Sequence, residues 1–329
     1  IYGLNIRDLS CMTRGKISRR MELMGHVWPI GGGKGGSGKS FLTSSLGRLS
    51  AAMGKRTLLI DLDLGAANLH TLVDVPYPKK CFSDFIRKKI PLLEDTVIET
   101  PVENLYLISG AHDNLDIANL PYEQKIKTLK AISRLDYDHI LLDLGAGTSF
   151  NTLDFFLISE NGIFVTTPEP TSIENVYRLI RSIYFRRMRQ YFTVTDFKTL
   201  EQRVDETFGG GSLNKPECMM RVIRDRYTDV YARLADDFKR FRFRLAVNQL
   251  RKHDSPDLGR QICRIIEKHL ALQVDFAGNI AFDDHVHDAI CARVSFLDRY
   301  PYTKTAVDLR QLGKSIVQTS GQQLQIHYS

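Results

Sequence analysis

The chain has 329 residues, of which 43% are hydrophobic and 25% are charged, as in an ordinary globular protein. No apolar stretch approaches the ~20 residues of a membrane-spanning helix, and the length allows one large α/β domain or at most two domains. The 45 Lys and Arg residues exceed the 38 Asp and Glu residues, which gives a net charge of +7 and predicts a cationic surface.

The N-terminal segment, residues 1–25, is mixed and basic and lacks the pattern of a signal peptide, so we expect an extension or docking arm. The five cysteines are scattered without a C-x-x-C pair, which argues against a zinc or iron–sulfur site and favours a reducing compartment. We therefore expect a cytoplasmic protein, either free or peripheral at a membrane or nucleoid surface.

A glycine-rich loop follows a predicted strand at residues 26–30 and precedes an apolar pattern of helical spacing that starts at Phe41. Residues 33–40 (GKGGSGKS) fit the phosphate-binding pattern G-x-x-x-x-G-K-[ST]. In such a loop the backbone N–H groups surround a polyphosphate, Lys39 reaches its β and γ phosphates, and Ser40 offers a hydroxyl to Mg²⁺. The expected nucleotide-binding residues are Gly33, Lys34, Gly35, Gly36, Ser37, Gly38, Lys39, Ser40 and Phe41.

Two other interpretations of this glycine-rich loop are weaker. A flexible glycine linker would not need the full spacing between a strand and a helix. A dinucleotide-binding loop also fits, because Gly31, Gly33 and Gly36 form G-x-G-x-x-G and Asp61 ends the next strand. That loop has no use for a Lys-Ser pair at the helix start, whereas a nucleoside triphosphate with Mg²⁺ requires one.

Apolar strands recur along the chain, each followed by polar or glycine residues and then a helical pattern. They are predicted at residues 56–61, 105–108, 139–143, 163–166 and 245–248. This alternation predicts an α/β fold with a doubly wound, mostly parallel sheet flanked by helices, whose ligands bind at the carboxyl ends of the strands.

Two acids end predicted strands, and a third follows one of them closely. Asp61 and Asp63 lie two residues apart beside the expected γ-phosphate position, where a carboxylate can orient water or a metal-bound water. Either acid could instead cap the following helix. Asp143 ends an apolar strand about a hundred residues after the loop, where P-loop enzymes hold Mg²⁺. The predicted metal site therefore comprises Ser40, Asp61 and Asp143.

The alternation of strands and helices is interrupted at about residues 193–240, a charge-rich stretch with helical pieces such as residues 222–238. We expect a helical insertion there, within a single P-loop domain that covers residues 26–329. Near the C-terminus, Leu309, Leu312 and Ile316 share one helical face, which indicates a helix that covers the core rather than one that binds a membrane.

Taken together, these motifs resemble the MinD/ParA family of deviant-Walker ATPases, whose marker K-G-G-x-G-K-[ST] is matched by residues 34–40. Residues 61–68, 143–147 and 166–173 are similar to the motifs of FlhG/FleN flagellar-number regulators and MinD-like proteins. The FlhG-type N-terminal activation motif is not visible in residues 1–25, and the insertion at about residues 193–240 is larger than expected for that group.

The resemblance implies an ATP hydrolase, slow without a partner, that forms an ATP-dependent homodimer with nucleotide at the interface. Lys34 would then reach the phosphates bound by the partner subunit, and Lys34, Lys39 and Asp63 would be the catalytic residues, with Asp63 positioning water. The resemblance also implies that Asp143 serves the metal and that Asn248 reads the adenine edge, although an Asn at a strand end is also common in turns. ATP and Mg²⁺ are the implied cofactors.

Basic residues concentrate in two segments, residues 178–189 with interleaved aromatics and residues 239–244. Such segments attract DNA or anionic lipid, although a solvated face with inward aromatic rings explains the same pattern. Three functions follow: a nucleotide-dependent switch in spatial positioning or regulation, with a regulatory protein partner; a DNA-partitioning ATPase; and a P-loop ligase or synthetase.

Overall fold

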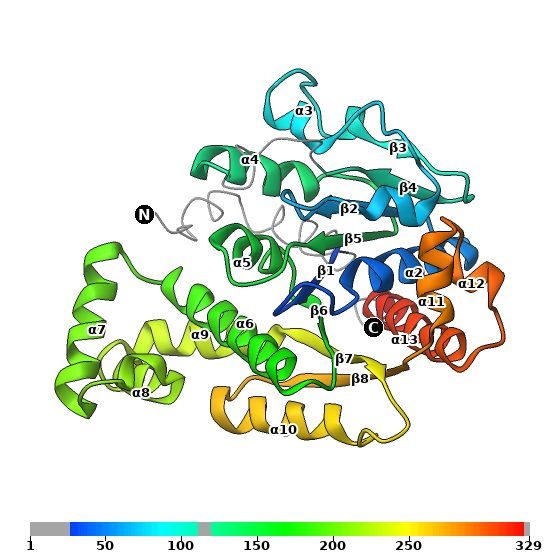
Figure 1. Ribbon diagram of the computed structural model, residues 1–329. Coiled ribbons are helices and arrows are strands. Elements are labelled where there is room, and N and C mark those ends of the chain that lie inside the picture. Colours follow the sequence, from blue (N-terminus) through cyan, green and yellow to red (C-terminus); the bar gives the residue numbers. More distant parts are fainter. Residues whose placement is uncertain (1–26, 111–119, 326–329) are drawn as a thin grey trace.

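A computed structural model describes residues 27–110 and 120–325 of the chain, with the side chains described as far as residue 316. The predicted N-terminal extension, residues 1–25, lies outside these ranges. Eight strands form one sheet in the order β3-β4-β2-β5-β1-β6-β7-β8 (Figure 1). Every neighbouring pair is parallel except β3 with β4, so the predicted doubly wound, mostly parallel sheet is confirmed.

The five predicted strands after the first are all present, each within a few residues of its expected bounds, and the first extends into the glycine-rich stretch. Two strands, β3 and β8, were not predicted. The first is only two residues long, and the second lies at the edge of the sheet and has half-exposed residues in place of an apolar run. The strands are β1 (Val27–Gly32), β2 (Thr57–Leu62), β3 (Ile98–Glu99), β4 (Leu105–Ile108), β5 (His139–Leu144), β6 (Asn161–Thr166), β7 (Arg242–Leu250) and β8 (Val274–Ala281).

Helices cover both faces of the sheet (Figure 1). The longer ones are α2 (Lys39–Ala52), α4 (Tyr122–Ile132), α6 (Pro170–Arg189), α7 (Val194–Phe208), α8 (Pro216–Arg226), α9 (Thr228–Arg240), α10 (Leu258–Leu270) and α13 (Lys304–Gln325). Shorter turns of helix are η2 (Leu69–Val73), α3 (Phe82–Ile86), η3 (Glu94–Thr96), α5 (Phe150–Phe156), η5 (Ser212–Asn214), α11 (His285–Cys291) and α12 (Phe296–Arg299).

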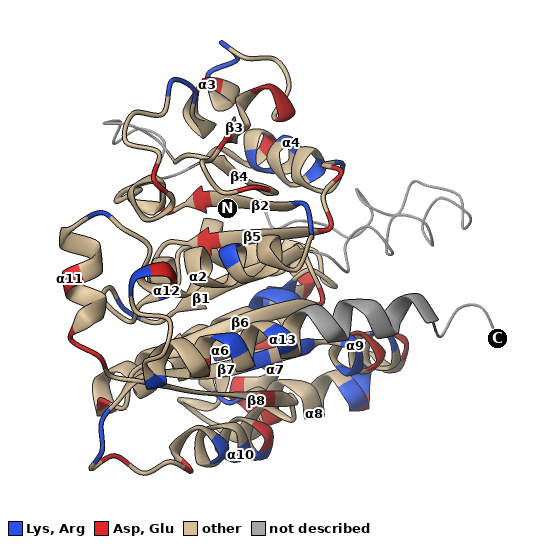
Figure 2. Ribbon diagram, turned by 90° about the vertical axis from the view of Figure 1, so that its right-hand side faces the viewer, with Lys and Arg blue, Asp and Glu red and all other residues tan. Residues whose placement is uncertain are grey.

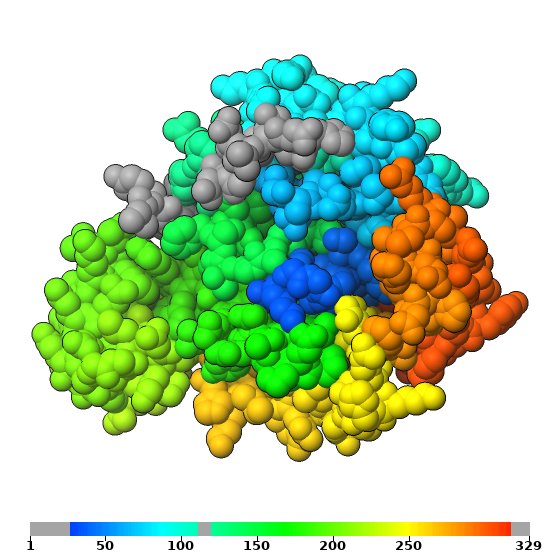
Figure 3. All heavy atoms as spheres, in the orientation of Figure 1, coloured from blue at the N-terminus to red at the C-terminus, as the bar shows by residue number. Residues whose placement is uncertain are grey.

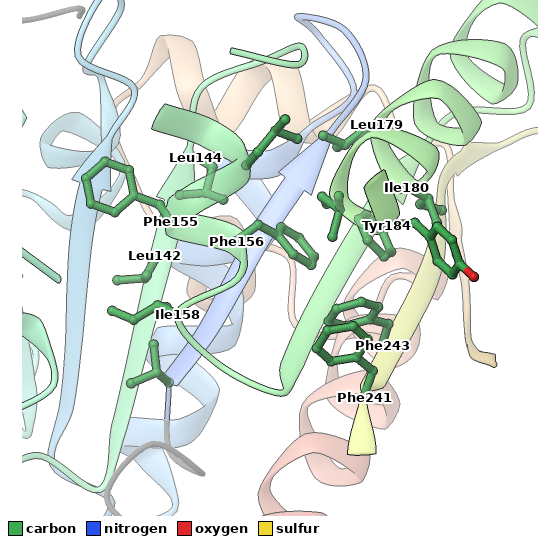
Figure 4. Close-up of a cluster of buried hydrophobic side chains, with 14 of the residues drawn as sticks. Leu142, Leu144, Phe155, Phe156, Ile158, Leu179, Ile180, Tyr184, Phe241 and Phe243 are labelled. Carbon is green, nitrogen blue, oxygen red and sulfur yellow. The ribbon is translucent and has the colours of Figure 1, made fainter. Parts of the chain in front are cut away.

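Alternating side chains of the strands build two cores. In β2, Leu58 and Ile60 belong to the core on the face covered by α3, α4, α5, α6 and α10, whereas Leu59 belongs to the core on the other face, with α2 and α13. In the first core the aromatic rings of Phe156 and Phe243 pack edge to face, and Figure 4 shows them between α5, α6 and the sheet. Because helices cover both faces of the sheet, the central strands appear in the sequence as continuous apolar runs.

Helices α7, α8 and α9 form a lobe at one end of the molecule, at the left of Figure 1. Their bounds span residues 194–240, close to the range predicted for an insertion. The prediction of one helical piece across residues 222–238 was wrong, because Tyr227 leaves helical geometry (φ −136°, ψ 56°) and separates α8 from α9.

The C-terminal helix α13 packs against α2 and β8. Leu309, Leu312 and Ile316 are buried there, so the prediction of a core-covering helix is confirmed. Within the described residues, no helix combines the length and the apolar character that crossing a bilayer requires.

Candidate functional site

The glycine-rich loop joins β1, in the middle of the sheet, to α2, and it lies near the centre of the face shown in Figure 3, in dark blue. Two glycines in it are required by the structure. Gly38 has φ 88°, and a Cβ there would lie 2.1 Å from the amide nitrogen of Asn248. At Gly33 a Cβ would lie 2.2 Å from the backbone of Asn175 in α6. Packing on both sides therefore holds the loop in a tight wrap.

Lys39 and Ser40 begin α2 directly after this loop and face Asp143 at the end of β5. Lys39 is almost fully buried, at 7% exposure. Burial raises the pKa of Asp143 to about 6, against the opposing effects of a hydrogen bond with Ser40 and of the Lys39 charge. The Thr43 hydroxyl lies 3.4 Å from the same carboxylate. The structure thus brings together the loop lysine, the loop serine and the strand-end acid.

Asp61 and Asp143 occupy paired positions in neighbouring strands, β2 and β5. Asp61 is fully buried, and burial followed by repulsion from Asp143 holds its pKa well above the usual value. Both of its oxygens accept backbone N–H groups, from Asp63 at 3.1 Å and from Leu69 at 3.0 Å. Since Leu69 begins η2, Asp61 also performs the capping role that the sequence left open.

Asp63 follows β2 and lies beside the segment after β5. A Cβ on Gly145 would be 3.3 Å from the Asp63 carboxylate, so the two segments touch. The Gly147 N–H donates to the Gly32 carbonyl at 3.3 Å, which ties the same segment to the end of β1. The segment after β5 therefore contacts both Asp63 and the end of β1.

The second lysine of the loop, Lys34, points to a different partner. Its ammonium forms an ion pair with Glu169, at the start of α6, and the two side chains are 32% and 58% exposed. Prolines on both sides of Glu169 restrict its backbone. Glu169 lies within the family-like motif at residues 166–173, but nothing in the sequence predicted a role for its side chain.

Asn248 lies at the end of β7, as predicted, and its side-chain nitrogen donates to the Ser37 carbonyl at 2.9 Å. The side-chain nitrogen of the next residue, Gln249, donates to the Gly36 carbonyl at 3.1 Å. The sequence did not predict this contact, because nothing in it distinguishes Gln249 from an ordinary turn residue. Both amides therefore hold the loop, whether or not Asn248 also contacts a base.

Much of the basic segment around α6 is compensated within the chain. Arg186 is buried and makes two hydrogen bonds to Asp154, and Arg187 pairs with Asp237. Arg240 pairs with Asp237 as well. Lys and Arg residues also occur in other elements, such as α4 and α10, in blue in Figure 2.

No group of three or more His, Cys, Asp or Glu side chains in the described ranges is arranged to hold a metal by itself. A cation between Ser40 and Asp143 would need oxygen ligands from a bound phosphate or from water, as Mg²⁺ commonly has. The buried, mutually repelling pair Asp61 and Asp143 fits such a cation, because a positive charge would relieve that repulsion.

Comparison with known proteins agrees with this geometry. The profile of the CobQ/CobB/MinD/ParA nucleotide binding domain matches residues 29–296. Antiactivator FleN of Pseudomonas aeruginosa is 27% identical over 217 residues, which are 64% of this chain and 74% of FleN. Septum site-determining protein MinD of Thermotoga maritima is 30% identical over 158 residues, 48% of this chain and 58% of MinD.

Among solved structures, MinD of Pyrococcus horikoshii, determined with Mg-ADP, superposes with a TM-score of 0.61 at 19% identity. The match covers 88% of this chain and 95% of that one, so the two chains share a fold over most of their length. On its fold, its loop and its match over most of its length, this chain belongs to the MinD/ParA family of P-loop nucleotide-binding ATPases.

Proposed function

We propose that this chain binds Mg²⁺-ATP, hydrolyses it, and uses the nucleotide state to switch between monomer and homodimer in spatial positioning or regulation. The relatives FleN, named an antiactivator, and MinD, named a septum site-determining protein, support this class of role. The match spans 74% of FleN and 58% of MinD.

One observation carries the proposal: the two lysines of the loop have different surroundings. Lys39 is buried beside Asp143, where it serves the nucleotide of its own chain. Lys34 is one-third exposed and pairs with Glu169 outside that site. A triphosphate in one subunit needs only one such lysine, so an outward Lys34 is suited to neutralise charge on a nucleotide held by a second subunit, as arginine fingers do.

The remaining roles follow from positions already described. Ser40 and Asp143 would hold Mg²⁺, with Asp61 reached through water because both of its oxygens accept backbone N–H groups. When bound, the ion would neutralise charge on the phosphate oxygens. Asp63, less buried and next to the Gly145 segment, is placed to orient the attacking water.

A regulatory protein is the partner that we favour over DNA or anionic lipid, because several arginines of the predicted basic segment are used in internal ion pairs. Co-sedimentation with DNA and with anionic vesicles at two salt concentrations tests both alternatives. Retention that weakens with salt would support an electrostatic surface ligand.

The decisive experiment compares Lys34→Ala with Lys39→Ala. We expect Lys34→Ala to bind a fluorescent ATP analogue normally, to remain monomeric with ATP in light scattering, and to lose hydrolysis by on the order of 10³-fold, the scale of a cation supplied in trans. Lys39→Ala should lose nucleotide binding itself.

The wild-type protein supplies the reference for both variants. A wild-type monomer–dimer balance that ATP does not change would refute the switch. Hydrolysis that Lys34→Ala leaves intact would refute the role of Lys34 while leaving the ATPase assignment in place.

A further inference from the structure

Gln249 has a backbone conformation that residues other than glycine seldom adopt. Its φ is 60°, in the left-handed region where a side chain with a Cβ is strained. The pairing of β7 with β8 also shifts register between Val247 and Leu250. The irregularity therefore lies at the point where β7 passes the glycine-rich loop.

This conformation changes where the Gln249 side chain points. In an extended strand, successive side chains lie on opposite faces, so Asn248 and Gln249 could not both reach one loop. Here the Asn248 nitrogen donates to Ser37 at 2.9 Å and the Gln249 nitrogen donates to Gly36 at 3.1 Å. The left-handed turn is what allows both amides to bind adjacent peptides.

The two contacts bear on phosphate binding because of how a peptide is oriented. A phosphate-binding loop needs its N–H groups to point inward, and the carbonyl of each such peptide then points away from the phosphate. The carbonyls of Gly36 and Ser37 are held from outside by these two amides. Gly36 has φ 78° and would otherwise be free to rotate.

We propose that Gln249, together with Asn248, is a positioning residue that fixes the loop peptides in the phosphate-binding orientation before nucleotide arrives. The backbone strain at Gln249 is the cost of this preorganisation. This inference rests on the proposed binding of ATP and goes beyond it by assigning a role to a residue that would not touch the phosphates.

The test uses two substitutions at Gln249 and two measurements: the melting temperature of the nucleotide-free protein, and the Kd for Mg²⁺-AMPPNP by calorimetry. Gln249→Gly removes the amide and relieves the strain, so we expect a higher melting temperature with a Kd raised about two- to tenfold, the range of one lost hydrogen bond. Gln249→Met keeps the length and the strain, so we expect a raised Kd without the gain in melting temperature.

Ala271→Gly is the matched control, since Ala271 also has a left-handed φ, 49°, but caps α10 away from the loop. It should raise the melting temperature and leave the Kd unchanged. The inference is overturned if either variant at Gln249 binds AMPPNP as the wild type does. A wild-type protein that fails to bind AMPPNP would overturn the proposed function itself, which is a different result.

Discussion

Two sets of buried carboxylates in this protein have opposite surroundings. In the helices beside the lobe, Asp154 receives two hydrogen bonds from Arg186, at 2.7 and 2.8 Å, and pairs with Lys125 at 2.5 Å. Asp237 accepts from Arg187 and Arg240, and although burial alone would raise its pKa, these hydrogen bonds hold that pKa below the usual value. Each of these two acids, Asp154 and Asp237, is paired with two cations, and we call them the scaffold acids.

At the carboxyl edge of the sheet, Asp61 and Asp143 are equally buried, yet they lie next to each other. Burial raises both pKa values, and the charge on Asp143 raises that of Asp61 further. For Asp143, a hydrogen bond with Ser40, the Lys39 charge and a hydrogen bond with Thr43 offset the rise in pKa only in part. The scaffold acids are therefore neutralised by paired cations of the chain itself, whereas the site acids, Asp61 and Asp143, keep raised pKa values, which is the pattern expected of a functional site.

The largest effect should come from a scaffold acid. Asp154→Ala leaves Lys125 and Arg186 buried without their carboxylate, so we expect a loss of about 3–5 kcal/mol in the free energy of unfolding, measured in urea. Glu174→Ala is the control, because its pair with Arg178 is exposed and should contribute less than about 1 kcal/mol. Equal losses in the two variants would contradict the contrast drawn here.

A site acid should respond in the opposite direction. Asp143→Asn removes a buried charge whose pKa is raised to about 6, so we expect the nucleotide-free protein to gain about 2 kcal/mol at pH 8. The same variant should lose the extra stabilisation that Mg²⁺ gives with nucleotide. Asp237→Asn, by contrast, should be less stable than the wild type. A loss of stability in Asp143→Asn would contradict the contrast between the two sets of acids.

The stability gain expected for Asp143→Asn should also depend on pH. A carboxyl whose pKa is raised in the folded state destabilises that state as pH rises from the unfolded value, 3.8, through the folded value, about 6. The stability difference between Asp143→Asn and wild type should therefore be near zero at pH 4 and reach its full size by about pH 8. Urea titrations at several pH values measure it, and a difference that is constant with pH would exclude this cause.

The smallest effect concerns the ion pair between Lys34 and Glu169. Because both side chains are partly exposed, Glu169→Gln should change the free energy of unfolding by less than about 1 kcal/mol. If Lys34 must leave Glu169 to reach a partner, self-association with ATP should tighten by up to about fivefold in light scattering. Glu174→Gln, equally exposed on the same helix, should change neither, and weaker association in Glu169→Gln would contradict the release of Lys34.

The positions of Asp61 and Asp143 could be predicted from the sequence because parallel strands align their carboxyl ends, whatever the side chains do. The ion-pair partners of Arg186 and Arg187 could not be predicted from the sequence. Adjacent residues on a helix differ by about 100° in direction, and the partners, Asp154 and Asp237, lie on other elements. Charge in the sequence predicted a basic surface, but pairing across elements neutralised part of it.

The sheet, the phosphate-binding loop and the order of the strand-end acids can be read from the sequence alone, since local spacing of glycine, apolar and acidic residues specifies each of these. Which charges are compensated, the ion pair of Lys34 with Glu169, and the turn of Gln249 back to the loop emerge only from the folded chain. These features depend on contacts between residues that are distant in the chain, and such contacts leave no periodic signal in it.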